Sequence, residues 1–323
     1  MPPSQCPSCS APRDRGTECP ACGVVYAKAE ARALRTGREP QTEPPPPQDR
    51  PGSAVLDEIR LGRELQDARL ELVERTWAFP VALVGCFLLV KAGLGHFLLR
   101  TFLSMWVHEL GHAVTAWFCG IPALPGPWIT LTGSGRSFFV TLALGGALGY
   151  LVWHGRSQKS RVLVAFGAVL MALQLVGTFL VPFEKARALV TFGGDAGCLV
   201  LGSALMATVY LDPEHHVRRQ WLHWGFLVIG AAAFTDTFEE WWSARTDFSR
   251  IPFGELEGSG LPSDPSALVQ HGWTAGQIVH RYVGLGVLCL VALVALYTWY
   301  LKRARAALDA AEQAAARLRT NRD

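Results

Sequence analysis

Long apolar runs separated by short polar segments dominate residues 77–301 of the chain. A helix needs about 20 mainly apolar residues to cross the hydrocarbon core of a bilayer. Runs of roughly that length occur at residues 77–99, 101–118, 138–153, 162–181, 188–211, 221–241 and 279–301. The pattern predicts an all-α polytopic membrane protein with about six or seven transmembrane helices.

Polar segments flank this membrane core on both sides. Residues 1–35 carry four cysteines, and residues 36–53 are rich in proline, which is the composition of an extended linker. Residues 54–75 predict an amphipathic helix that lies on the membrane or on the protein, because their heptads are too short and irregular for a coiled coil. The predicted domains are a zinc ribbon (1–35), a linker with a helix (36–76), the membrane core (77–301) and a basic C-terminal helix (302–323).

Composition agrees with a membrane location. Half of the 323 residues are hydrophobic, and the net charge of +3 is too small and too scattered to predict a nucleic-acid partner. The N-terminus lacks a charged segment followed by an apolar one, so the first span is expected to act as an uncleaved insertion signal.

Basic residues predict the orientation of the spans. The loops around Arg156 and Arg218 and the tail after Lys302 carry clustered Lys and Arg, which predicts that they and the C-terminus are cytoplasmic. The first two runs almost meet at Arg100, and Lys91 interrupts the first, so one of the two is expected to be a partial or re-entrant helix. An even number of crossings would also keep the N-terminal cysteines inside. We expect a multi-pass protein of a bacterial cytoplasmic membrane.

One motif inside the second run carries the candidate chemistry. His108, Glu109 and His112 form an HExxH sequence in a stretch that is otherwise almost uncharged. In a helix the two histidines lie one turn apart on one face and can bind one zinc ion, and Glu109 can take a proton from a water on that ion. Ionisable residues in a span cost about 2.5–3.5 kcal/mol each on insertion scales, so they tend to be functional. The alternative to a metal site is that one histidine is bonded to a carbonyl, the other lies at a helix end, and Glu109 is paired locally.

A catalytic zinc takes three protein ligands and leaves a position for water, so a third ligand is expected on another span. Asp195 is the best candidate, because it stands alone in an uncharged run and is flanked by glycines that allow close helix packing. An alternative is that Asp195 caps a helix start. Rival ligands are three acids, expected at a solvated helix end, and three histidines: Asp236, Glu239, Glu240, His223, His271 and His280.

Two CxxC pairs mark the N-terminal segment. Cys6 with Cys9 and Cys19 with Cys22 can supply four thiolates, which make a closed tetrahedral zinc site that stabilises a fold rather than catalyses. Two disulfides or a redox dithiol are the alternatives. The segment resembles the short zinc ribbons found at the ends of many bacterial proteins, which implies a surface for an unknown protein partner.

Two connecting segments are candidates for covering the site. Residues 120–136 combine Pro and Gly with a strand-like stretch at 128–132, which predicts either a substrate-facing hairpin or an ordinary surface loop. After Trp242 comes an acidic segment that contains Asp247 and Asp264, with a short helix expected from Ser266. We interpret it as a connecting loop or, alternatively, as a lid.

The chain resembles the site-2 protease family of intramembrane zinc metalloproteases, in its divergent bacterial branch. The resemblance rests on HExxH in an early span and a glycine-flanked Asp195 in a later one. The resemblance covers roughly residues 77–211. It implies that His108, His112 and Asp195 bind zinc and that Glu109 is the catalytic base. The membrane core departs from the family in containing no Asn, where many members carry an Asn-Pro motif near the aspartate.

The sequence therefore predicts an intramembrane zinc metalloprotease that hydrolyses peptide bonds in or near transmembrane segments of membrane-protein substrates. Its cofactors would be a catalytic zinc in the core and a structural zinc in the ribbon. The alternative is an inactive protease-like scaffold or a metal transporter. A transporter should repeat acids and histidines along several spans, whereas here they concentrate in one motif and Asp195.

Overall fold

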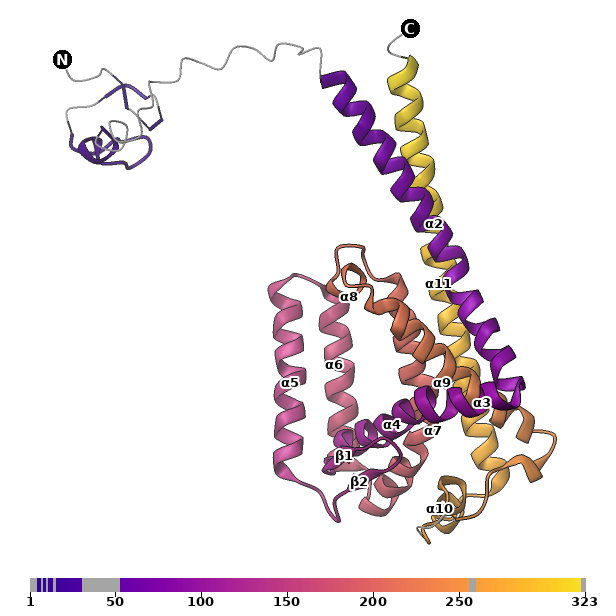
Figure 1. Ribbon diagram of the computed structural model, residues 1–323. Helices are drawn as coiled ribbons and strands as arrows, with labels where there is room; N and C mark the ends of the chain where they lie inside the picture. The colour runs from indigo at the N-terminus through magenta and orange to yellow at the C-terminus, as the bar shows by residue number, and fades with distance from the viewer. Residues whose placement is uncertain are drawn as a thin grey trace. The chain divides into compact units, whose positions relative to one another are not determined.

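Long helices form most of the chain that the computed structural model describes, which is residues 5–6, 8–9, 11–13, 16–30, 53–255 and 260–320 (Figure 1). The chain divides into two compact units, Met1–Arg60 and Leu61–Asp323. The predicted proline-rich linker, residues 36–53, lies outside the described residues except for its last position.

Two similar turns build the first unit. The backbone N–H of Cys6 donates to the carbonyl of Ala11 at 2.8 Å, and that of Cys19 donates to the carbonyl of Val24 at 2.9 Å. Each bond closes one CxxC turn, so both turns present their thiols in the same way. Among the described residues of this unit, Cys6, Cys19 and Tyr26 have buried side chains.

Helix α2 (Ser53–Lys91) leads into the second unit, which is helical apart from one hairpin. In it, η1 and η2 are short π-helical segments, and η3 and η4 are single 3-10 turns. The elements after α2 are α3 (Gly93–Leu99), η1 (Arg100–Ser104), α4 (Met105–Phe118), β1 (Ala123–Pro125), β2 (Thr130–Thr132), α5 (Phe138–Ser157), α6 (Arg161–Leu175), η2 (Val176–Leu180), α7 (Phe183–Ala207), η3 (Thr208–Tyr210), α8 (His216–Arg219), α9 (Leu222–Ala244), η4 (Phe248–Arg250), α10 (Asp264–Gln270) and α11 (Ala275–Thr320).

Helices α2 and α11 run past the boundaries predicted from the sequence. α2 joins the amphipathic segment to the first apolar run, and α11 joins the last run to the basic tail. The two lie side by side (Figure 1): Arg69 pairs with Glu312 at 3.1 Å, and the Tyr297 hydroxyl donates to the Thr76 carbonyl at 3.4 Å. The backbone N–H and C=O groups at a helix end lack partners within the helix, so ending a helix is unfavourable. A helix therefore continues when no residue breaks it and a neighbouring helix covers its apolar face.

Among the described residues, five helical segments are long and apolar enough to cross a membrane, which indicates a membrane protein. This number is lower than the predicted count of about six or seven. The second predicted run is helical throughout, because η1 leads directly into α4, but the HExxH motif makes it too polar. The sixth predicted run is too polar, because α9 carries three acids near its C-terminal end. The five segments are Glu58–Lys91, Phe138–Ser157, Arg161–Leu180, Phe183–Tyr210 and Ala275–Leu318.

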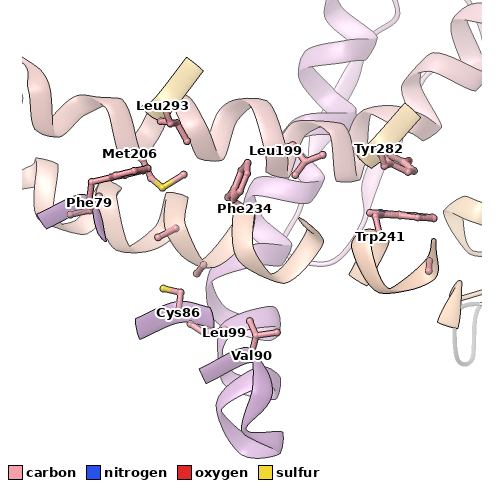
Figure 2. Close-up of a cluster of buried hydrophobic side chains, with 14 of the residues drawn as sticks. Phe79, Cys86, Val90, Leu99, Leu199, Met206, Phe234, Trp241, Tyr282 and Leu293 are labelled. Carbon is pink, nitrogen blue, oxygen red and sulfur yellow. The ribbon is translucent and has the colours of Figure 1, made fainter. Parts of the chain in front are cut away.

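Helix α7 lies at the centre of the second unit and packs against α4, α9 and α11. The rings of Trp241 and Tyr282 stack with centroids 4.3 Å apart, and the Tyr282 hydroxyl donates to the Phe192 carbonyl at 3.2 Å. Figure 2 shows the apolar side chains that α2, α7, α9 and α11 contribute to this core, among them Phe79, Leu199, Met206, Phe234 and Leu293.

Glycines let α4 and α7 approach closely. A Cβ added at Gly111 of α4 would lie 2.8 Å from the Cα of Gly197 and would overlap the carbonyl oxygen of Gly193. Small residues at a helix crossing let backbones meet in a membrane, where apolar burial alone does not drive helices together. The glycines that flank Asp195, which were predicted to allow close helix packing, therefore pack α7 against α4, the helix with the HExxH motif.

The hairpin β1–β2 follows α4, and hydrogen bonds join β1 to α4 and the segment after β2 to the residue that follows α4. Trp117 Nε1 donates to the carbonyl of Ala123 at 3.0 Å, and the Arg136 guanidinium donates to the carbonyl of Cys119 at 3.1 Å. The strand-like stretch predicted at residues 128–132 thus belongs to a hairpin that packs on α4.

Candidate metal centre

Helix α4 carries the two histidines of the HExxH motif one turn apart. Their Nε2 atoms lie 3.1 Å from each other, and the ring planes are inclined by 87°. Residues four apart on a helix lie on one face. The helix predicted for this motif is present and brings two imidazole nitrogens to one point.

The hydrogen positions on both rings follow from their partners. His112 Nδ1 lies 2.7 Å from the carbonyl oxygen of Val190, and His108 Nδ1 lies 3.0 Å from Asp195 Oδ1. Carbonyl and ionised carboxylate oxygens only accept hydrogen bonds, so Nδ1 carries the hydrogen in each ring. A neutral imidazole then has its lone pair on Nε2, which is what a metal ligand needs.

The carboxylate of Asp264 completes the cluster. Its Oδ2 atom lies 3.0 Å from Nε2 of His108 and 3.0 Å from Nε2 of His112. Three electron-rich atoms at this spacing repel one another unless a cation lies among them. Tetrahedral ligands at about 2.05 Å from a zinc-sized ion stand about 3.3 Å apart, close to these separations. The donor set therefore fits a metal ion, and these three residues can hold it.

Asp195, predicted as the third ligand, lies on the other side of His108. One carboxylate oxygen accepts from His108 Nδ1, and the other accepts from Trp241 Nε1 at 2.8 Å. Both oxygens thus bond groups away from the Nε2 atoms, and among the described residues the group that could hold a metal ion contains Asp264 and not Asp195. A carboxylate behind a metal-binding histidine orients the ring and makes it a better ligand. Sequence reasoning also missed Trp241, which no spacing connects to Asp195.

Asp264 reaches the histidines from the segment between α9 and α11. It begins α10, which Pro265 and the fully buried Leu268 anchor in the core. The sequence predicts a short helix here without linking it to α4.

Gly194 makes room for the two imidazole rings. A Cβ at this position would lie 2.5 Å from Nε2 of His112 and 2.6 Å from Nε2 of His108. These separations are far inside van der Waals contact, so a side chain there would displace both ligand atoms. Gly194 is therefore part of the site and not only of the helix packing.

Glu109 is buried beside the first ligand, with 5% of its surface exposed. The Thr130 hydroxyl oxygen lies 2.7 Å from Oε2 of Glu109 and 2.8 Å from the backbone carbonyl oxygen of the same residue. Within the described residues, the other carboxylate oxygen, Oε1, has no hydrogen-bond partner. Thr130 therefore holds Oε2 of this carboxylate, and Oε1 is available to accept a proton.

The acids of α9 form ion pairs and Asp236 is buried, in contrast to the solvated helix end that was expected. Asp236 is only 2% exposed, and a cavity of about 420 Å³ adjoins the group. The bases come from the end of α2 and from α3 and η1, so separate runs of the sequence meet here. Each acid therefore has a basic partner. The pairs are Asp236 with His96, Glu240 with Arg100 and Glu239 with Lys91.

The three rival histidines lie elsewhere. His223 Nε2 is 3.3 Å from a carboxylate oxygen of Glu74, and His280 Nδ1 donates to the carbonyl of Gly276 in its own helix at 2.7 Å. His271 follows the last residue of α10. None of the three belongs to the cluster of His108, as far as the described residues show.

The N-terminal cysteines form a second cluster that can bind a metal ion. Cys6 Sγ lies 3.8 Å from Cys22 Sγ, and Cys9 Sγ lies 3.7 Å from Cys19 Sγ. Tetrahedral ligands at a zinc–sulfur distance of about 2.3 Å stand about 3.8 Å apart, whereas a disulfide needs about 2.05 Å. All four thiols are free, which rules out the disulfide alternative. Each close pair joins the two CxxC turns, so a bound ion would cross-link them.

Comparisons of the chain with protein-family models, with curated proteins and with solved structures found no match. What the centre can do therefore has to follow from its own chemistry. Three ligands leave the fourth position of a tetrahedral ion to a water or a substrate oxygen, and a buried carboxylate follows the first ligand in the chain.

Proposed function

We propose that this protein is an intramembrane zinc metalloprotease that hydrolyses peptide bonds in or near transmembrane segments of membrane-protein substrates. The observation that carries the proposal is the convergence of Nε2 of His108, Nε2 of His112 and Oδ2 of Asp264, with Glu109 on the same helix as the two histidines. Three protein ligands with an open fourth position are typical of catalytic zinc. The five long apolar helices support a site that works within a bilayer.

Each residue of the site has a distinct task in this proposal. Zinc held by these three ligands would supply a Lewis acid, which would bring the pKa of a water toward about 7 and polarise the scissile carbonyl. Glu109 accepts a proton from the attacking water and gives it to the leaving amine. Asp195 and the Val190 carbonyl hold His108 and His112 so that both Nε2 atoms stay directed at one point.

An extended peptide is the form of substrate that suits this site. Carbonyls in a helix are engaged in the helix's own hydrogen bonds, so a transmembrane substrate has to unwind before attack. The hairpin β1–β2 touches Glu109 through Thr130 and exposes Leu124 and Leu131. These apolar side chains offer a surface beside the base for an unwound apolar segment.

The resemblance to the site-2 protease family agrees with this proposal, with a change in the ligand set. Asp264 lies outside the region that carries the resemblance and takes the ligand position that the resemblance implies for Asp195. In the N-terminal unit, we infer that Cys6, Cys9, Cys19 and Cys22 hold a structural zinc, because four thiolates close the coordination sphere. The ribbon would then present a surface to a protein partner.

The test is Glu109→Gln in the purified full-length protein. Cleavage is measured on a panel of single-span peptides with a fluorophore and a quencher, reconstituted in proteoliposomes. We expect the variant to keep about two zinc ions per chain and to lose about 10²–10⁴-fold in cleavage rate, which is the usual contribution of a general base.

Glu184→Gln is the matched control, because Glu184 is exposed in the first turn of α7. It should cleave at the wild-type rate. Cleavage retained by the Glu109 variant would reject the mechanism. Zinc uptake into the same proteoliposomes without any cleavage would favour the transporter alternative.

A further inference from the structure

One side chain from outside α4 bonds the carboxylate of the base. The hydroxyl of Thr130 has a single hydrogen and two acceptors within reach, Oε2 of Glu109 at 2.7 Å and the Glu109 carbonyl oxygen at 2.8 Å. An ionised carboxylate is the stronger acceptor of the two. The hydroxyl therefore fixes Oε2 and leaves Oε1 as the oxygen that can exchange a proton.

The hairpin presents this hydroxyl from a defined position. Thr130 begins β2 and pairs with Pro125 of β1. At the base of the hairpin the N–H of Gly133 donates to the carbonyl of Pro122 at 2.8 Å. The carbonyl of Ala123 in β1 also accepts a hydrogen bond from Trp117 of α4. A donor on an ordered strand holds its partner more closely than one on a loose loop does.

A buried glutamate needs such a holder. Its side chain has several rotatable bonds, and a carboxylate out of water is costly unless it is hydrogen-bonded. Since Glu109 is 5% exposed, water offers it little support. A base that drifts by about 1 Å can lose about 100-fold in rate.

We propose that Thr130 is a positioning residue for Glu109, which keeps Oε1 of the base directed at the attacking water. The inference rests on the proposed function, because it concerns how the same base is held. The strand supplies its own control: Thr132 lies two residues further on, in the same strand, and is exposed. The bonds to Glu109 come from Thr130 alone among the described residues of the hairpin.

The experiment compares Thr130→Val, Thr130→Ser and Thr132→Val in the full-length protein, with the peptide panel in proteoliposomes as probe. Valine keeps the shape of threonine and removes the hydroxyl. We expect Thr130→Val to lower kcat by about 10- to 100-fold with KM nearly unchanged. Thr130→Ser should recover most of kcat, and Thr132→Val should match the wild type. Zinc content and melting temperature should stay constant throughout.

Several results would overturn the inference. Equal kcat in Thr130→Val and Thr132→Val would show that the hydroxyl does not hold the base. A raised KM with unchanged kcat would assign Thr130 to substrate binding instead. Equal losses in the Val and Ser variants would show that the hydroxyl is irrelevant, and if Thr130→Val does not fold, Thr130→Ala is compared with Thr130→Ser by the same criterion. These outcomes leave the proposed function intact, whereas wild-type protein without Glu109-dependent cleavage would reject both.

Discussion

The two candidate metal clusters of this protein are built in opposite ways. The four cysteines come from two short turns within one small unit, and each turn is closed by a backbone hydrogen bond. The ligands of the membrane cluster come from α4 and α10, with four long helices between them in the chain. The first cluster offers four donors to one ion, whereas the second offers three.

The difference also extends to what surrounds the ligands. In the membrane cluster each histidine is held from behind, His108 by Asp195 and His112 by the Val190 carbonyl, and Gly194 leaves space for both rings. A structural site needs only the ligands that close it. A reactive site also needs groups that fix the direction of each ligand, because the open position must stay at one place.

Removing one ribbon ligand gives the largest effect and tests whether the two clusters are independent. In Cys22→Ser the N-terminal unit should lose its zinc and its folded state, because such small units depend on the metal. Cleavage by the membrane core should not change. Zinc per chain, measured by mass spectrometry, should fall from about two to about one.

Cys289→Ser is the control for this substitution, because Cys289 lies on α11 in the apolar core of the second unit. It should retain both zinc ions. A loss of cleavage in Cys22→Ser would show that the clusters are coupled and would break the comparison.

The next effect separates the ligand from the group behind it. With Cys22→Ser as background, so that only the core zinc is counted, Asp264→Ala should lower zinc affinity by more than about 100-fold. Asp195→Ala should lower it by about 10- to 100-fold, as removal of outer partners of metal ligands does. Asp195→Asn should lose less than Asp195→Ala, since the amide oxygen still accepts from His108 Nδ1. Competition with a zinc-binding dye measures all three.

Asp247→Ala is the matched control, because Asp247 lies in the same segment after α9 and bonds Ser249. Its zinc affinity should equal that of the background. If Asp195→Ala costs more than Asp264→Ala, the ligand assignment implied by the family resemblance is right and the one from geometry is wrong.

The smallest effect is expected from a substitution that tests whether Gly194 makes room for the rings of His108 and His112. Gly194→Ala should lower the stability of the zinc-bound protein by about 1–2 kcal/mol, because the methyl group would overpack the site. Gly146→Ala on α5 is the control, since no atom lies within 4 Å of the added Cβ. It should be neutral or stabilising by up to about 1 kcal/mol. Thermal unfolding in detergent, with and without zinc, measures both. Equal melting temperatures would refute the packing argument.

The sequence by itself determined what adjacent residues can do together. Positions four apart on a helix share a face, so HExxH was enough to predict that His108 and His112 meet. Two CxxC turns in one short segment were likewise enough to predict the cysteine cluster. In both cases the ligands lie close together in the sequence, so their spacing alone indicates that they can meet.

Only the tertiary structure decided which distant residues join them. Asp195 and Asp264 are both carboxylates on segments after α4, and only the packing of α7 and α10 shows that one lies behind His108 and the other in front. The pairing of Asp236 with His96 and the contact of Thr130 with Glu109 were decided in the same way. Contacts between elements depend on how whole faces fit together, and no local spacing records that fit.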